Sequence, residues 1–181
     1  MNSGNHMTAN AGEKVKLLSR QLDALKQEGK IERIVFAESC TAGLVSALVG
    51  QVPGISEFLC GSAVTYRESV RQQWLGVPSE TLKNSSAESA KTAEAMAVGV
   101  LNKTEEATCS AAISGDLDGV TFVCVAAKNE SDQAMAITIG TYRLQSRSRS
   151  ERQYESAANV IEMITDLLAG VFYSPDNDPR K

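Results

Sequence analysis

The chain has 181 residues, of which 43% are hydrophobic and 22% charged, and its formal net charge is -4. This composition is typical of one globular domain, and the acidic balance argues against a basic surface that attracts nucleic acid or an anionic membrane. The single histidine, His6, lies among polar N-terminal residues. A catalytic serine or cysteine that depends on imidazole is therefore excluded.

The ends of the chain are polar, and the apolar runs are shorter than the roughly 20 residues that a membrane-spanning helix needs. With no signal-peptide pattern at the start, we expect a cytoplasmic protein. We predict a tag or disordered N-terminus over residues 1–12, one domain over 13–173, and a disordered tail over 174–181. Four cysteines lie singly without paired spacing, so reduced thiols are favoured over a zinc site, and neither a metal nor a cofactor is predicted.

The first half of the chain alternates predicted strands and helices. Apolar periodicity predicts helices and strands over these segments: helix 13–28, strand 31–37, helix 41–51 and strand 58–66. A short helix through Val70 and Trp74 is expected to end at Gly76, and Pro78 opens a turn. Ser85 and Glu88 have capping-box spacing ahead of a helix that continues to about residue 102.

The second half contains three predicted strands and a closing helix. The strands cover 108–113, 120–127 and 135–142, and their short connections favour antiparallel pairing. Ser148 and Glu151 have capping-box spacing before the last helix. The order predicts an α/β fold, a layered mixed β-sheet flanked by helices on both faces. Ligands in such folds commonly bind where a strand ends and a helix begins.

The first such junction is Glu38-Ser39-Cys40-Thr41. Backbone N–H groups at a helix start favour anions, so Ser39 could be a nucleophile or a phosphate ligand. Alternatively, Ser39 or Thr41 is simply the N-cap of the helix. Cys40 is a weaker candidate nucleophile: a helix start can lower a thiol pKa, but no histidine or lysine accompanies it here.

Several segments in series resemble the C-terminal domain family of CinA, the competence- and damage-inducible protein. They are Ala37-Glu38-Ser39-Cys40-Thr41-Ala42-Gly43, Val52-Pro53-Gly54-Ile55-Ser56, Ala63-Val64-Thr65-Tyr66 and Leu75-Gly76-Val77-Pro78, followed by Thr81-Leu82. The resemblance extends from about Val15 to about Gly170 and thins after Asn84.

The resemblance implies hydrolysis of the carboxamide of nicotinamide mononucleotide (NMN), giving nicotinic acid mononucleotide and ammonia. It makes Ser39 the nucleophile and Glu38, Thr41, Thr65 and Tyr66 parts of the pocket. It also implies a small-molecule nucleotide as partner, while homo-oligomerisation is possible and neither nucleic acid nor membrane is expected. In the family, a lysine shortly after the Thr-Tyr pair looks like the companion base.

This chain departs from the family pattern at three places. Arg71 stands at the position of the lysine, and a guanidinium is not a general base. The glycine-rich loop is shortened to the segment from Ser114 to Thr121, which keeps Gly115 but carries two acids. The family's Gly-Asp-Arg is replaced by Ser148-Arg149-Ser150.

Arginines gather near the predicted last helix: Arg143, Arg147, Arg149 and Arg152. We expect Arg147 and Arg149 to grip a phosphate, although these arginines could instead pair with nearby acids.

Two hypotheses follow for the function. In the first, Ser39 attacks the amide, N–H groups at the helix start hold the oxyanion, and Tyr66 carries the proton. In the second, the chain is a catalytically inactive relative that binds a nucleotide or phosphate without turnover.

Overall fold

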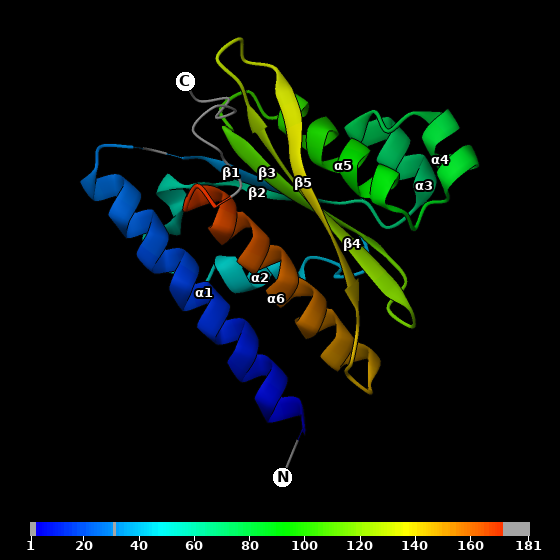
Figure 1. Ribbon diagram of the computed structural model, residues 1–181, viewed down its shortest axis with the longest axis horizontal. Coiled ribbons are helices and arrows are strands. Elements are labelled where there is room, and N and C mark those ends of the chain that lie inside the picture. Colours follow the sequence, from blue (N-terminus) through cyan, green and yellow to red (C-terminus); the bar gives the residue numbers. More distant parts are fainter. Residues whose placement is uncertain (1–2, 31, 172–181) are drawn as a thin grey trace.

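The computed structural model describes residues 3–30 and 32–171, with side chains from residue 9 on, and its centre is a five-stranded sheet (Figure 1). The strands are β1 (Ile34–Glu38), β2 (Leu59–Val64), β3 (Cys109–Gly115), β4 (Val120–Lys128) and β5 (Ala134–Arg143). Their order across the sheet is β2-β1-β3-β4-β5. β1 pairs in parallel with both neighbours, whereas β3, β4 and β5 pair antiparallel. The predicted mixed sheet is confirmed.

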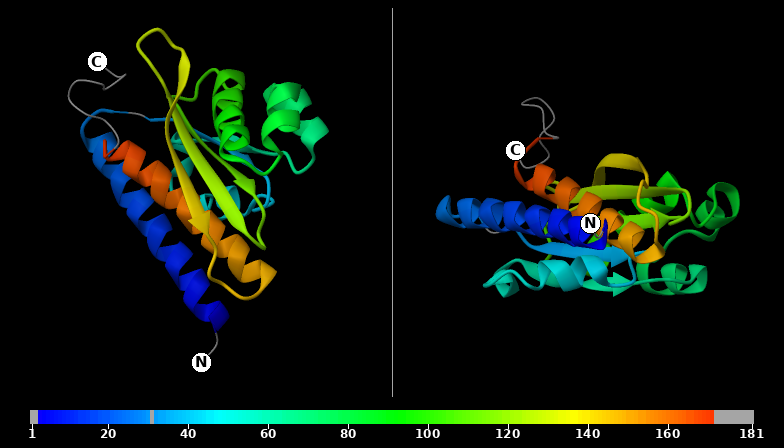
Figure 2. Two further views of the ribbon diagram at one scale, coloured as in Figure 1. Left: turned by 45° about the vertical axis from the view of Figure 1, so that its right-hand side comes forward. Right: turned by 90° about the horizontal axis from the view of Figure 1, so that it is seen from below.

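Helices cover both faces of this sheet. They are α1 (Ser3–Gln27), α2 (Leu44–Val49), α3 (Glu68–Val70), α4 (Ser79–Ser85), α5 (Ala90–Lys103) and α6 (Arg149–Leu168), with a short 3₁₀ helix η1 (Ile55–Glu57) and a short π-helix η2 (Arg71–Leu75). α1 and α6 lie side by side on one face, and α5 lies on the other (Figure 2). Among residues 3–30 and 32–171, no helix is both long and apolar enough to cross a membrane.

Each face of the sheet has its own apolar core. On one face, Phe36 of β1 packs with Leu18 of α1 and Ile161 of α6. On the other, Val35 of β1 packs with Met96 of α5 and Leu75 of η2. Alternate residues of β1 thus enter different cores, which explains the uninterrupted apolar run of this strand.

The structure corrects several predicted boundaries. α1 begins at Ser3 instead of residue 13, and Ala11 is fully buried in the core. β1 begins at Ile34, and the predicted strand start at residue 31 lies outside the described residues. The predicted disordered tail over 174–181 also lies outside them.

Two of the predicted helix starts have different outcomes. The Ser148–Glu151 capping box of α6 is confirmed by reciprocal hydrogen bonds. The Ser85–Glu88 capping box is wrong: Ser89 is the N-cap of α5, and its side chain accepts a hydrogen bond from the Thr92 N–H. The segment after Pro78, where the sequence predicts a turn, forms the helix α4.

Candidate functional site

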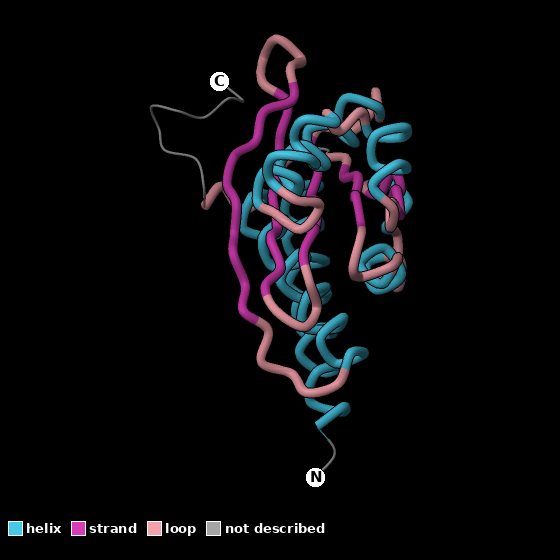
Figure 3. The backbone as a smooth tube through the Cα atoms, turned by 90° about the vertical axis from the view of Figure 1, so that its right-hand side faces the viewer, coloured by secondary structure: helices cyan, strands magenta, loops and turns pink. Residues whose placement is uncertain are grey.

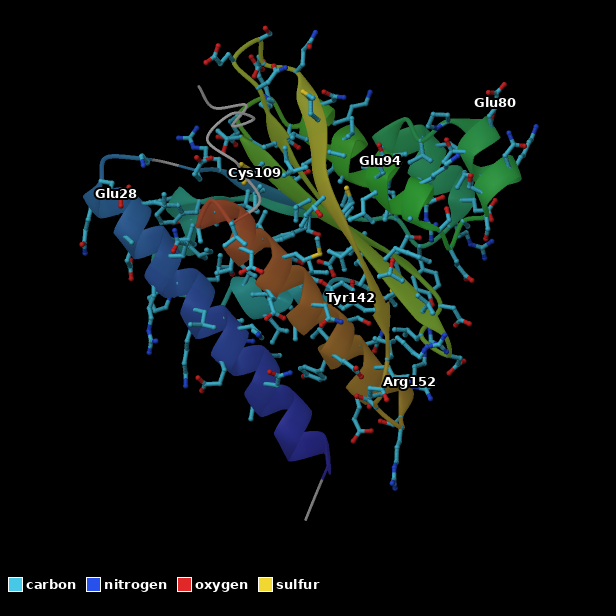
Figure 4. The ribbon with its side chains drawn as sticks, in the orientation of Figure 1. Glu28, Glu80, Glu94, Cys109, Tyr142 and Arg152 are labelled. Atoms are coloured by element: carbon cyan, nitrogen blue, oxygen red, sulfur yellow. The ribbon has the colours of Figure 1, made fainter. Side chains whose placement is uncertain are left out.

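The predicted site residues gather at one edge of the sheet. Ser39 follows β1, Thr65 follows β2 and Gly115 ends β3, so the carboxyl ends of three parallel-oriented strands meet there. α6 begins at the same edge, as the position of Arg152 in Figure 4 shows, whereas Cys109 marks the opposite edge. This is the edge at which ligands bind in related open sheets.

Glu38, the last residue of β1, is a buried carboxylate that is fully surrounded by donors. Its side chain is 1% exposed. Five groups within 3.0 Å donate to it, namely the Thr41 and Ser62 hydroxyls and the N–H groups of Gly43, Val45 and Ser46. Charge-assisted hydrogen bonds of this kind are among the stronger ones in proteins. Glu38 therefore holds the strand-to-helix loop in one conformation.

This arrangement occupies five backbone N–H groups around the start of α2 that could otherwise bind an anion. The N–H groups of Gly43, Val45 and Ser46 donate to Glu38, and those of Ala42 and Leu44 donate to the Ser39 and Thr41 carbonyls. None of these five groups is free to bind a phosphate or an oxyanion. The alternative that Ser39 or Thr41 is the N-cap of this helix is wrong, because the N-cap is Gly43.

The loop stores backbone strain beside the candidate nucleophile. Ala42 has φ 53 and Gly43 has φ 95, two successive left-handed residues. A side chain is unfavourable in this region, and positions of this kind persist where surrounding contacts determine the backbone. The donors to Glu38 supply those contacts. The family segment thus encodes a particular loop shape as well as a serine.

Arg71 is a buried cation directly against Ser39. Its guanidinium donates to the Ser39 hydroxyl oxygen from Nη2 at 2.6 Å and to the Thr65 carbonyl from Nε at 3.1 Å. Nη1 donates to the Ala87 carbonyl at 2.5 Å and the Ser114 hydroxyl at 3.3 Å. Burial lowers the pKa of the Arg71 guanidinium, opposed by nearby thiol and carboxyl groups.

The charge of Arg71 is not balanced by a neighbouring carboxylate. Arg71 is 4% exposed, and in the part of the chain that the structure describes it forms no ion pair. Buried charges in proteins are ordinarily paired. Thr65 is fully buried beside it, and the Thr65 hydroxyl has no hydrogen-bond partner among the described residues. An unbalanced positive charge and an unpaired hydroxyl group therefore lie side by side, and both could interact with a ligand.

Burial disfavours Cys40 as the nucleophile. Burial raises the pKa of its thiol to about 11, and the backbone N–H groups and Arg71 and Arg149 oppose this only in part. The direction is the reverse of that expected for a reactive thiolate at a helix start.

The other predicted residues, Tyr66 and the arginines near α6, are more exposed than Ser39 and Arg71. Tyr66 is 54% exposed, and its hydroxyl accepts a hydrogen bond from Arg149 Nη2 at 2.9 Å. Arg147, two residues before Arg149, is also exposed. Arg152 instead pairs with Asp118 and donates to the Ser146 carbonyl, as the alternative of acid-paired arginines predicted for this group. Arg149 thus reaches the Tyr66 side of the site, and Arg152 does not.

Gly115 has a structural reason to be glycine. The shortened loop is a tight hairpin, in which Asp116 N–H donates to the Val120 carbonyl. A Cβ on Gly115, whose φ is 141, would lie 2.5 Å from the Val120 carbonyl oxygen and 2.6 Å from Thr121 Cα. Any ligand contact by Gly115 stays a prediction.

Sequence reasoning missed three residues that shape the site. Ser62 completes the donors around Glu38, while Ser114 and the Ala87 carbonyl hold Arg71. The Ala87 contact belongs to the backbone and gives no signal in side-chain identity. Metal binding gains no support, since the described residues contain no group of three or more acidic, cysteine or histidine side chains that could hold an ion.

Cavities elsewhere do not include these residues. One of about 600 Å³ lies at the opposite edge of the sheet, between Glu32, Thr108 and Lys128. A second of about 540 Å³ lies between α4 and α5. The candidate site is therefore recognised by its charges and hydrogen bonds.

Curated bacterial proteins resemble this chain over part of their length. It is 44% identical over 79 residues to a CinA-like protein of Myxococcus xanthus, which is 44% of this chain and 18% of that protein. It is 32% identical over 165 residues to a putative competence-damage inducible protein of Streptococcus thermophilus, covering 87% of this chain and 37% of that protein. The chain thus spans well under half of these relatives.

Solved structures share the fold. The competence/damage inducible protein CihA of Agrobacterium tumefaciens has a TM-score of 0.75 at 23% identity, covering 87% of this chain and 95% of that one. A CinA superfamily protein of Klebsiella pneumoniae has a TM-score of 0.74 at 22% identity, covering 88% and 98%. The family model described as the CinA C-terminal domain matches residues 15–168. This chain belongs to the CinA C-terminal domain family.

Proposed function

We propose that this chain binds an anionic pyridine mononucleotide of the NMN type at the Ser39–Arg71 site and does not turn it over as a serine amidohydrolase. The observation that carries the proposal is the hydrogen bond of 2.6 Å from Arg71 Nη2 to Ser39 Oγ. It places a permanent cation where serine activation would need a base.

Binding is supported by the unbalanced charge. A buried guanidinium surrounded by neutral oxygens gains from an anion that enters its neighbourhood. The unpartnered Thr65 hydroxyl can bond to the same ligand. Arg149, which donates a hydrogen bond to the exposed Tyr66 hydroxyl, adds a second cation on the exposed side of the site. Together these groups suit a ligand with a phosphate and a polar ring substituent.

Lack of turnover is supported by what surrounds Ser39. Hydrolysis by a serine needs a group that accepts the hydroxyl proton and donors that stabilise the oxyanion. Arg71 remains a cation although burial lowers its pKa, because a guanidinium loses its proton less readily than any other cationic side chain. Glu38 already accepts five hydrogen bonds, and the N–H groups of residues 42–46 are occupied.

Deamidation of NMN, which the family resemblance implies, is the second candidate. One observation favours it: Arg71 donates to the Ser39 oxygen, so it would stabilise the alkoxide that attacks the amide. Tyr66, hydrogen-bonded to Arg149, would then have to carry the proton. The two candidates share a ligand and differ in ammonia release.

The test combines binding and turnover on the same variants. Calorimetric titration uses NMN and, as a ligand without phosphate, nicotinamide; ammonia release from NMN is followed by a coupled assay. We expect NMN but not nicotinamide to bind, with affinity lowered at least tenfold in Arg71→Gln and in the Arg147→Ala/Arg149→Ala double variant. Arg20→Gln, an exposed arginine on α1, is the matched control and should bind like the wild type.

Each outcome decides between the candidates. Binding of NMN without release of ammonia supports the proposal. A gain of ammonia release in Arg71→Lys would show that Arg71 is the reason why the wild type does not hydrolyse NMN. Ammonia release by the wild type that Ser39→Ala abolishes establishes the second candidate. If NMN binds neither the wild type nor Arg71→Lys, both are wrong.

A further inference from the structure

β5 is a long and largely uncharged edge strand. It covers ten residues at the end of the sheet, contains no proline, and carries no charged side chain before Arg143. Its one irregularity is a bulge near Ile137, where the pairing with β4 shifts. Natural proteins usually protect an edge strand with proline, lysine or a covering segment, because its outer backbone groups can pair with another chain.

Apolar side chains of β5 are exposed along this edge. Met135 is 48% exposed and Ile139 is 36% exposed, and they lie on a strand at the free margin of the sheet (Figure 3). A second strand laid alongside β5 would satisfy its outer backbone groups and cover these side chains.

The two ends of β5 carry opposite charge. The turn before the strand contains Glu130 and Asp132, both exposed, with the Asp132 side chain 80% exposed. Lys128 partly offsets them, but its side chain is only 12% exposed and also donates to the Glu105 carbonyl. At the other end, Arg143 is exposed and forms no ion pair among the described residues.

This polarity matches a second copy of the same strand. When β5 pairs antiparallel with itself about a two-fold axis, the basic end of each copy meets the acidic end of the other. With the axis through Thr138, which then faces its own counterpart, Arg143 lies opposite Gln133 of the other copy. The other copy's Asp132 is then one residue further, about 3.4 Å along an extended strand and within reach of an arginine. Parallel pairing would instead place like charges together.

We propose that the chain forms a two-fold dimer through antiparallel β5–β5 pairing, in which Arg143 of each copy pairs with the Glu130–Asp132 turn of the other. The sheet then continues through ten strands across the dimer axis. The edge at β2 fits less well, because β2 has six residues and Glu57, just before it, is already paired with Lys26.

A charge-exchange experiment tests this interface. Molar mass is measured by light scattering and sedimentation over a range of concentrations. The wild type is expected to approach twice the 19.3 kDa mass of one chain. Arg143→Asp and Asp132→Arg should each weaken dimerisation at least tenfold, since they place like charges together. The double variant carries both changes in every copy, restores the complementarity and should recover most of the affinity.

Two further variants separate this edge from the rest of the surface. Ile139→Lys introduces a charge at the centre of the interface and should give monomers whose circular dichroism matches the wild type. Trp74→Ala, near β2 and 55% exposed in the wild type, should leave the molar mass unchanged. The proposal is overturned if the wild type is monomeric throughout, if the single charge variants dimerise normally, if the double variant stays as weak as either single one, or if Trp74→Ala alone dissociates the dimer.

Discussion

Glu38 and Arg71 are both buried at the carboxyl edge of the sheet, yet they are accommodated in different ways. Glu38 receives five hydrogen bonds, three of them from backbone N–H groups at the N-cap and in the first turn of α2. Arg71 donates to two backbone carbonyls and two serine hydroxyls, and its nearest acids act only at a distance. The charge of Glu38 is compensated by hydrogen bonds within the fold. The charge of Arg71 is not balanced by an anion and can still attract one.

The difference assigns the two residues different work. Glu38 determines the loop conformation, because its donors lie between 3 and 24 positions further along the chain and meet at one carboxylate. Arg71 contacts the candidate nucleophile itself, so it determines what Ser39 can do. A residue whose hydrogen bonds are all internal contributes to stability, whereas one with an unbalanced charge can also contribute to binding.

Replacing Glu38 is the largest expected perturbation. Glu38→Gln keeps the side-chain size but removes the charge and turns one accepting atom into a donor that faces other donors. We expect a loss of about 3–5 kcal/mol in unfolding free energy, because buried donors lose a charged partner. Urea denaturation followed by circular dichroism measures the loss, and a shift below about 1 kcal/mol would contradict a central structural role. Glu57→Gln, an exposed glutamate, is the control.

Replacing Arg71 should cost much less stability. Arg71→Met retains an unbranched side chain but removes a buried charge whose desolvation is only partly compensated. Lost hydrogen bonds to Thr65 and Ala87 and relief of that desolvation oppose each other, so we expect a net change of roughly 0–2 kcal/mol. The same urea titration tests this value. If Arg71→Met destabilises the fold as much as Glu38→Gln, the contrast between the two charges is wrong.

The sequence predicted the layers of the fold better than the edges of its elements. Apolar periodicity was sufficient for β1, β4 and α6, because these elements bury most of one or both faces. It failed at Pro78, where α4 buries only Leu82 and gives no periodic signal. At the start of α5, Ser85 instead ends α4, and Ser89 caps the helix through local hydrogen bonds with Ser86 and Thr92.

The residues of the candidate site could be proposed from the sequence, but the arrangement of their side chains could not. The junction after β1 and the substitution at Arg71 were both visible in residue identity. The orientation of Glu38 was not, since a carboxylate at the end of a strand can face a ligand or turn back onto the loop. That choice depends on Ser62 in β2, which is adjacent only after β1 and β2 pair.

Cys40 is two residues after Glu38 and lies in the field of Arg71. The pKa of its thiol therefore shows whether burial or the positive charge has the larger effect at this place. If the field of Arg71 controlled the local environment, the pKa of the Cys40 thiol would fall below its ordinary value. Burial instead raises the pKa to about 11 from 9.0. The folded protein therefore holds a proton that the unfolded chain releases. This contribution to stability is complete below about pH 9 and is lost as the pH rises toward 11.

The expected effect is small and has a definite sign. The stability advantage that the wild type has over Cys40→Ala should shrink above pH 9, by at most about 1.4 kcal/mol per pH unit. Thermal denaturation of both proteins across this range measures it, and thiolate absorbance in a variant with Cys40 as its only cysteine gives the pKa directly. A pKa below 9.0 would show that the cation outweighs burial. Ser39, the neighbouring residue, would then also lie in a field able to stabilise its alkoxide, and the case for hydrolysis would strengthen accordingly.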